Sequence, residues 1–220
     1  YLRYNTVLNH IKDFLIFKGS SDIAFIDIDD KWINDLDEFL RLEKKLSNNT
    51  TLKYLKLFKK IYNIALRNGW ATKDPFANFK MKFDQVKREF LSLDEIKQLI
   101  DKNLHIDRLE HVRDVFIFCC LTGLRFSDVS KLNQDDIHTN IDGSKSIIKK
   151  TQKSKTIIRV PLLPTAENLI NKYKDSIYCR VKGVCLPVIT NQRTNAYLKE
   201  IAELCGIKKN LTFHMARHTF

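Results

Sequence analysis

The sequence of 220 residues lacks several features that would set it apart from ordinary globular proteins. No run of apolar residues is long enough to cross a membrane. The opening YLRYNTVLNH has the pattern of an amphipathic helix and not of a secretory signal. The five cysteines include no C-x-x-C pair, which argues against a zinc ribbon or a dithiol redox site. We therefore expect a globular protein of the cytoplasm, with no membrane as a partner.

Motifs for nucleotide or metal chemistry are missing as well. The sequence contains no P-loop and no Asp, Glu and His cluster at metal-binding spacing. We therefore expect no metal site and no cofactor.

Positive charge is abundant and evenly spread. The formal net charge is +12. Residues 1–88 hold 17 basic and 11 acidic residues and the rest hold 21 and 15, so each part carries +6. A basic excess over two folded segments suits a protein that encloses a long polyanion such as nucleic acid. On charge alone, a basic protein without such a partner is the alternative.

Residues 1 to about 80 have helical periodicity. One apolar stripe runs from Tyr4 to Leu15 and is closed by Gly19, and a second helix starts near Asp30. A third is expected from Asn49-Thr50 to Asn68-Gly69.

The third helix is expected to carry a stripe of cations opposite its apolar side. The four residues are Lys53, Lys56, Lys60 and Arg67. Such a stripe could follow the phosphate backbone of DNA. A solvated helix face is the alternative.

A basic segment after Pro75 separates this helical region from the rest. We predict a helical domain over residues 1–82, a linker over 83–89 and a second domain over 90–220, whose first helix starts at the capping box Ser92-Leu-Asp-Glu95. In the second domain, two β-branched runs joined by Gln152-Lys153-Ser154 predict a β-hairpin. The expected fold class is mainly α with a small antiparallel β-sheet.

Three segments could carry chemistry. In LTGLRFSDVSKL, Arg125 follows a buried helix, and Asp128 could hold its guanidinium in place; a structural ion pair is the alternative. Lys153 lies at the hairpin tip, where solvation is the ordinary role of a lysine. In LTFHMARHTF, His214 and Arg217 share a helix face if Thr212 caps that helix, although a buried structural histidine is equally compatible.

Taken in order, TGLRFSD, TQKSKTIIRVPL and HMARHTF resemble the catalytic domain of tyrosine recombinases, the phage integrase family. Within the family, the sequence is most similar to integrases of mobile elements from Bacteroidetes-type bacteria. The resemblance implies a two-domain clamp on double-stranded DNA, with a helical SAM-like core-binding domain over 1–82 and a catalytic domain over 90–220. It also implies site-specific recombination by tetramers in the bacterial cytoplasm, with DNA-bending proteins as possible accessory partners.

The resemblance assigns roles to individual positions. Arg125 and Arg217 would clamp the scissile phosphate, His214 and Lys153 would assist proton transfer, Asp128 would support the first arginine, and His218 continues the motif. Two guanidiniums can donate bidentate hydrogen bonds to the phosphate oxygens without titrating. In the family a tyrosine attacks phosphorus, leaving a 3′-phosphotyrosyl link and a free 5′-hydroxyl.

The sequence departs from this pattern because no tyrosine follows Arg217. We therefore expect no nucleophile in this chain, a catalytic domain that is incomplete at its C-terminus, and DNA binding without strand cleavage. A DNA-binding protein without catalysis, either a decayed integrase or a module that occupies recombination sites, is the alternative. A type IB topoisomerase shares the arginines and the lysine.

Overall fold

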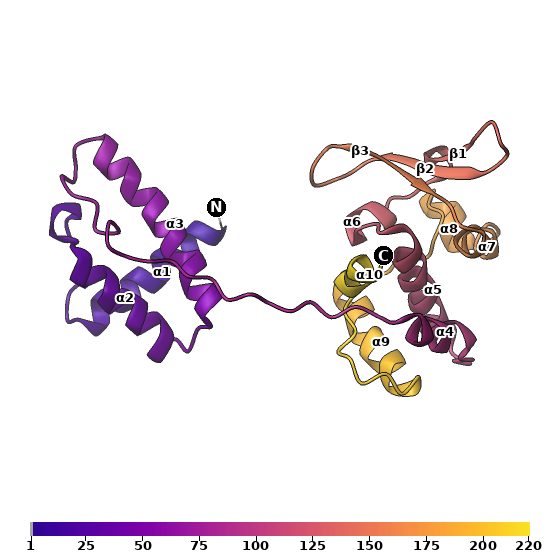
Figure 1. Ribbon diagram of the computed structural model, residues 1–220, viewed down its shortest axis with the longest axis horizontal. Helices are drawn as coiled ribbons and strands as arrows, with labels where there is room; N and C mark the ends of the chain where they lie inside the picture. The colour runs from indigo at the N-terminus through magenta and orange to yellow at the C-terminus, as the bar shows by residue number, and fades with distance from the viewer. Residues whose placement is uncertain (1) are drawn as a thin grey trace. The chain divides into compact units, whose positions relative to one another are not determined.

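The computed structural model describes residues 2–220 and shows a chain of two compact units, Tyr1–Val86 and Lys87–Phe220 (Figure 1). The first unit contains helices α1 (Leu2–Phe17), α2 (Asp30–Leu42) and α3 (Asn48–Arg67), with a short 3-10 turn η1 (Phe25–Asp27). The three helices expected from apolar spacing are therefore confirmed.

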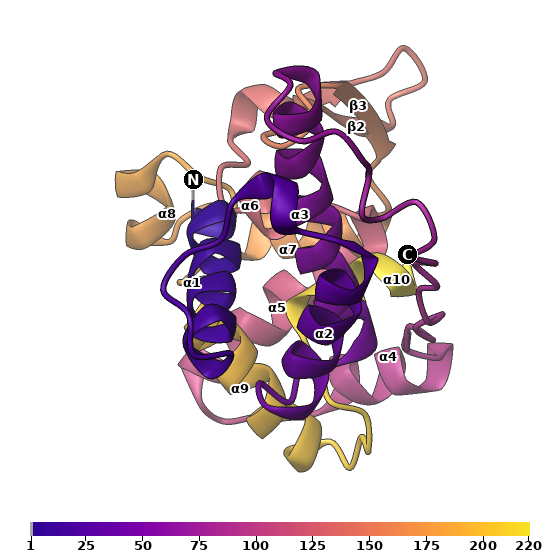
Figure 2. The same ribbon diagram turned by 90° about the vertical axis from the view of Figure 1, so that its left-hand side faces the viewer.

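The helices of the first unit pack around one core (Figure 2). Phe14, Ile33, Leu55 and Tyr62 are almost fully buried at its centre. Helix α2 starts where the Asp29 carboxylate accepts a hydrogen bond from the Trp32 backbone amide. Burial of the apolar stripes against one another thus fixes the orientation of each helix about its axis.

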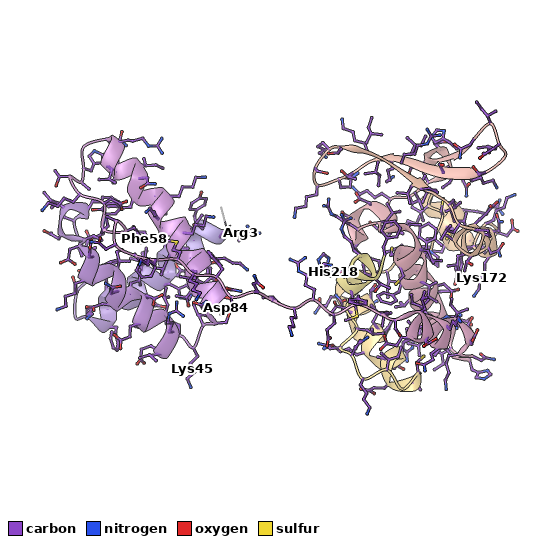
Figure 3. All side chains as sticks on the ribbon, in the orientation of Figure 1. Arg3, Lys45, Phe58, Asp84, Lys172 and His218 are labelled. Atoms are coloured by element: carbon purple, nitrogen blue, oxygen red, sulfur yellow. The ribbon has the colours of Figure 1, made fainter. Side chains whose placement is uncertain are left out.

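The segment after α3 has no helix or strand between residues 79 and 92, but its first part belongs to the first unit. Phe79 packs against the core. The side-chain amides of Asn48 and Asn49, at the start of α3, donate to the carbonyls of Lys82 and Asp84 at 3.0 Å each. The Asp84 amide donates back to Asn49 Oδ1 at 2.8 Å. These contacts fix the segment as far as residue 84 (Asp84 is labelled in Figure 3).

The second unit is helical apart from one small sheet. Its elements are α4 (Leu93–Asp101), α5 (Asp107–Thr122), α6 (Phe126–Val129), η2 (Gln134–Asp136), β1 (Ile137–Thr139), β2 (Lys145–Lys150), β3 (Ile157–Pro161), α7 (Pro164–Lys172), α8 (Ile177–Lys182), α9 (Asn191–Leu204) and α10 (Phe213–Thr219). Helix α5 is buried over most of its surface and packs against α4, α7, α9 and α10. The predicted capping box at Ser92 and Glu95 is present at the start of α4.

The sheet has the antiparallel order β1-β2-β3. The pairing of Ile147 with Val160 and of Lys150 with Ile157 places residues 151–156 in the turn between β2 and β3, as expected for the hairpin. Strand β1 was not expected, because three residues are too few to show an alternating pattern. The predicted fold class, mainly α with a small antiparallel sheet, is confirmed.

A search of the described residues for membrane spans finds no helix with the length and apolar character needed to cross a bilayer.

Candidate active site

The C-terminal end of α5 brings two of the three motifs together. Gly123 ends this helix in the left-handed conformation, with φ of +63°. Its carbonyl oxygen accepts a hydrogen bond of 2.9 Å from Nη1 of Arg217, which lies 94 residues further along the chain on α10. Arg125 follows two residues after the glycine, at the N-cap position of α6. The backbone of one motif therefore holds the arginine of the other.

Asp128 has a different partner from the Arg125 guanidinium that we expected. The Asp128 side chain is buried, and Oδ1 accepts a hydrogen bond of 2.7 Å from the backbone amide of Gln152 in the β2–β3 turn. Asp128 lies on the short helix α6, and this hydrogen bond directs its side chain to the hairpin. The carboxylate thus connects the first motif to the hairpin and not to its own arginine.

Lys153 follows this anchored residue directly. It is exposed at the hairpin tip and donates no hydrogen bond within residues 2–220. The turn is closed by the Thr151 amide, which donates to the Thr156 carbonyl at 2.9 Å. The neighbouring Lys131 Nζ reaches Gln152 Oε1 at 3.4 Å. The structure therefore fixes the backbone before Lys153 and leaves its ammonium group free.

The two histidines of the last motif lie against each other on α10. The ring centroids of His214 and His218 are 4.7 Å apart, with an angle of 87° between the ring planes. Thr212 occupies the N-cap position, where the sequence placed the start of this helix, but its hydroxyl makes no capping hydrogen bond. The Phe213 amide donates instead to Asn195 Oδ1 on α9 at 2.7 Å.

The surroundings of His214 lower the pKa of its imidazole. Partial burial lowers the pKa of this imidazole, and the positive charges of His218, Arg88, Arg217 and Arg125 lower the pKa further. The neutral imidazole is therefore favoured, and it can accept or transfer a proton. The hydrogen bond from Arg217 to Gly123 places Arg217 beside the backbone that leads to Arg125, and His214 lies on the same helix as Arg217. We name Arg125, His214 and Arg217 the arginine cluster.

One neighbour of the arginine cluster was not predicted from the sequence. Nη1 of Arg88 lies 3.4 Å from Nε2 of His218, across 130 residues of sequence (His218 is labelled in Figure 3). The only signal for Arg88 is the basic character of the segment before Ser92, and that signal does not indicate which surface the segment contacts.

The tyrosines of the second unit are engaged away from the arginine cluster. The buried Tyr173 hydroxyl donates to Asp114 Oδ2 at 2.7 Å, and burial beside that carboxylate raises the pKa of Tyr173. The Tyr178 hydroxyl donates to a backbone carbonyl on the loop after α8. The ring of Tyr197 lies under the Arg108 guanidinium, 4.6 Å from its centre. None of these hydroxyls is directed to the cluster.

In the first unit, the predicted cations do form an exposed stripe on α3. Lys53, Lys56, Lys60 and Arg67 are all exposed. The three lysines line a groove of about 810 Å³, to which Arg3 of α1 also contributes, whereas Arg67 lies outside it and donates to the Asn63 carbonyl. This groove is named the α3 groove.

No cluster of three or more His, Cys, Asp or Glu side chains arranged to hold a metal ion occurs in the described part of the chain.

Comparison with known proteins identifies the family. The profile of the phage integrase SAM-like domain matches residues 1–91, and that of the phage integrase family matches residues 89–220. The chain belongs to the phage integrase family, the tyrosine recombinases.

Relatives extend along the whole chain. Two proteins named tyrosine recombinase XerD, from Listeria innocua and Listeria monocytogenes, are 26% and 27% identical to it, and each match covers 100% of this chain and 78% of the relative. Among solved structures, a lambda integrase tetramer bound to a Holliday junction has a TM-score of 0.73 at 17% identity, covering 97% of this chain and 62% of that one. A lambda integrase fragment bound as a dimer to a core site has a TM-score of 0.70 at 16% identity, covering 97% and 79%. These neighbours share the fold of the chain.

Proposed function

We propose that the chain binds duplex DNA with both of its units and holds a scissile phosphate on Arg125 and Arg217, as part of a site-specific recombinase. The observation that supports the proposal is the hydrogen bond from Arg217 to the Gly123 carbonyl at the end of α5, two residues before Arg125. The setting that we propose is the bacterial cytoplasm, because the curated relatives are bacterial and two of the solved neighbours are bound to DNA.

The chemistry of the arginine cluster suits attack on a phosphodiester. Negative charge increases on the non-bridging oxygens as a nucleophile approaches phosphorus, and guanidiniums stabilise that charge without changing their own protonation. The leaving 5′-oxygen needs a proton, and Lys153 on its anchored hairpin is the donor that we propose. His214, held neutral by its surroundings, would exchange a proton with the attacking group.

The nucleophile that we propose is a tyrosine other than Tyr173, Tyr178 and Tyr197. All three are engaged elsewhere in the second unit. Attack by such a tyrosine would form the phosphotyrosyl bond and break the bond from phosphorus to the 5′-oxygen. The energy of the phosphodiester would be conserved, so that the strand could be rejoined. A covalent adduct on any of the three tyrosines, mapped by mass spectrometry after incubation with nicked DNA, would contradict this assignment.

The α3 groove is the DNA-binding surface that we propose for the first unit. Of the lysines that line it, Lys53, Lys56 and Lys60 are exposed and lie along one helix face, so their ammonium groups can follow successive phosphates. Lys12 on α1 is also exposed but lies half a turn away from the groove residue Arg3 at 100° per residue, which makes it a matched control.

Measuring DNA affinity as a function of salt concentration tests whether the α3 groove binds the phosphate backbone. Replacing Lys53, Lys56 and Lys60 by alanine should weaken binding of a labelled duplex in fluorescence anisotropy. It should also reduce the slope of log affinity against log salt by about 0.9 for each lost phosphate contact. Lys12→Ala should leave the slope unchanged. Equal slopes for the triple variant and the control would show that the groove does not contact the backbone.

Orthovanadate, which mimics phosphorus during displacement, tests the catalytic part. We expect vanadate to shift the imidazole resonances of His214 in NMR spectra, and Arg125→Ala or Arg217→Ala to abolish the shift. Arg193→Ala, an exposed arginine on α9, is the control. A DNA-binding protein without catalysis would bind DNA through the α3 groove without any vanadate response at the arginine cluster.

The family neighbours also suggest self-association on DNA. Solved lambda integrase neighbours are a dimer on a core site and a tetramer on a Holliday junction. We propose assembly of the same kind for this chain on its recombination site, with the accessory DNA-bending proteins as a further expectation. Sedimentation with and without a duplex that carries two binding sites would test the assembly.

A further inference from the structure

The loop that enters the second unit, residues 87–92, carries an arginine whose position is determined by the fold. The Leu91 amide donates to Thr219 Oγ1 on α10 at 3.0 Å, and the Leu91 side chain is buried. The Phe90 carbonyl accepts a hydrogen bond of 2.9 Å from Lys209 Nζ. The backbone is therefore fixed two and three residues after Arg88, close to the helix that carries His214 and Arg217.

The Lys209 contact is itself part of a larger anchor. Its ammonium group also binds Glu95 Oε2 at 2.6 Å, and that carboxylate accepts from the Ser92 amide at 2.7 Å in the capping box of α4. One lysine thus joins the loop before α10, the entering loop and the first turn of α4. A charged network of this kind resists displacement better than a single hydrogen bond.

Within this framework, the Arg88 guanidinium is positioned at the arginine cluster. Its Nη1 is 3.4 Å from His218 Nε2. Its charge is one of the influences that lower the pKa of His214, together with the charges of Arg125 and Arg217. Arg88 is therefore in contact with one histidine of α10, and the ring centroid of that histidine lies 4.7 Å from that of His214.

Within residues 2–220, the guanidiniums of Arg88, Arg125 and Arg217 have no carboxylate partner. The arginines of residues 2–220 that form ion pairs are Arg41, Arg108 and Arg113, none of which belongs to this cluster. The buried carboxylate on α6, Asp128, accepts a hydrogen bond from Gln152 instead. Grouping positive charges without a counter-charge is unfavourable unless an anion completes the site.

We propose that Arg88 is a third phosphate-binding residue, which donates to the DNA phosphate held by Arg125 and Arg217. The inference rests on the proposed function, because it assigns a further ligand to the same phosphate. The planar guanidinium of Arg88 is exposed, so it can turn from His218 to an incoming oxygen by a small change of its side-chain torsions. The loop acts as an arm that presents this group, while α10 presents Arg217.

The test compares Arg88→Ala with Lys87→Ala, which removes the adjacent cation of the same loop. Lys87 is exposed and forms no ion pair or side-chain hydrogen bond within residues 2–220, so it matches Arg88 in charge and exposure without the contact to α10. Vanadate affinity is measured from the imidazole resonances of His214 and His218, and duplex affinity is measured against salt.

We expect Arg88→Ala to weaken vanadate binding at least several-fold and to reduce the DNA salt slope by about 1, the value for one lost phosphate contact. Arg88→Lys should recover the salt slope but only part of the vanadate affinity, because a point charge cannot donate in the bidentate manner. Lys87→Ala should leave vanadate affinity unchanged. Unfolding curves should be the same for all three variants, since both side chains are exposed.

Two further outcomes separate the inference from the proposed function. If Arg217→Ala abolishes vanadate binding while Arg88→Ala and Lys87→Ala both behave like the unmodified chain, the third arginine is not a ligand and the proposed function stands. If neither Arg217→Ala nor Arg88→Ala alters vanadate binding, the arginine cluster is not a phosphate site and both proposals are wrong.

Discussion

Gly123 serves two purposes that are usually served by different residues. It ends α5 in the left-handed conformation, and its carbonyl oxygen orients Arg217. A β-carbon at this position would lie 2.6 Å from Cδ1 of Phe220. The main chain here is therefore constrained both by its conformation and by the side chain packed above it.

This double constraint predicts the effect of Gly123→Ala. The left-handed conformation should cost an L-residue about 1–2 kcal/mol of folding stability. Displacement of the Phe220 ring should add to that cost and disturb α10. We expect a lower melting temperature and a weaker vanadate response at the arginine cluster.

Gly143→Ala is the control for the backbone cost alone. This glycine has φ of +81° in the β1–β2 turn, and its added β-carbon would meet nothing within 4 Å. Gly143→Ala should lower the free energy of unfolding, because alanine is strained in the left-handed conformation, but it should keep the vanadate response. An equal and small loss in both variants would mean that the packing of Phe220 on Gly123 is unimportant.

His214 provides a second prediction at the scale of the residue. Because burial and the surrounding positive charges disfavour its protonated form, NMR titration should give a pKa below the ordinary value of 6.5. Arg217→Ala should raise this pKa, since it removes one of the opposing charges. Vanadate should also raise it, because an anion favours the imidazolium. A pKa of 6.5 or above in the free chain would show that the arginines do not act on this ring.

The lowered pKa of His214 also determines how the free energy of unfolding changes with pH. As pH falls, the unfolded chain binds a proton at His214 before the folded chain does, so the contribution of this residue is complete above pH 6.5 and is lost as pH falls through the lower folded pKa. The free energy of unfolding should therefore decrease more between pH 7.5 and pH 5.5 in the unmodified chain than in His214→Asn. The comparison with this variant is needed because the pKa of His10 is lowered as well. An identical decrease in both proteins would contradict the assignment.

At the scale of elements, the sequence analysis succeeded where apolar spacing was long and regular. Helices α1, α2 and α3 and the β2–β3 hairpin lie where they were expected. Helix α8 and strand β1 were not expected, because six and three residues are too short to show a period. The resemblance of the ordered motifs to tyrosine recombinases indicated Arg125, Lys153, His214 and Arg217 as one site, and this assignment stays a prediction.

What the sequence could not supply were contacts made across the fold. The Asp128 carboxylate has an arginine three residues away in sequence, yet it binds the Gln152 amide, 24 residues further on. The position of Arg88 depends on Thr219 and Lys209, which are distant in sequence from its loop. Neither partner has a local pattern that would reveal it, and the narrower resemblance to Bacteroidetes-type integrases also stays a prediction.

The contact between Asp128 and Gln152 gives a prediction about the hairpin. Asp128→Ala removes the acceptor of a charge-assisted hydrogen bond, so exchange of the Gln152 amide with solvent should become faster by about tenfold or more. Asp128→Asn keeps an acceptor oxygen and should preserve most of the protection. Asp142→Ala, in the β1–β2 turn, removes an acceptor from Ser144 and should leave Gln152 unaffected. An unchanged Gln152 amide in Asp128→Ala would mean that α6 does not hold the hairpin.

At the scale of the whole molecule, the linker backbone is hydrogen-bonded at both of its ends and, within residues 2–220, forms no backbone hydrogen bond at residues 85–89 in between. Asp84 is bound to Asn49 of the first unit, and Phe90 is bound to Lys209 of the second. The stretch of residues 85–89 spans at most roughly 20 Å when extended. If both units bind one duplex, the binding of one keeps the other at a high effective concentration.

A longer linker should therefore weaken DNA binding without altering either unit. Ten Gly and Ser residues inserted between Val86 and Lys87 should lower duplex affinity by about fivefold, from the dependence of effective concentration on the three-halves power of length. The same insertion at Gly143, in an exposed turn, should have no such effect. Unchanged affinity with the longer linker would show that one unit provides all of the binding.

The hydrogen bonds at the ends of the linker also determine where a protease can cleave the folded chain. The backbone of Lys87 and Arg88 forms no hydrogen bond with the described part of the chain, so trypsin can cut after either residue without opening either core, and each piece keeps its own packed interior. With Arg88 seated on a phosphate, the bond after it would be shielded. The rate of cleavage after Arg88 would then report on the occupancy of the arginine cluster by DNA.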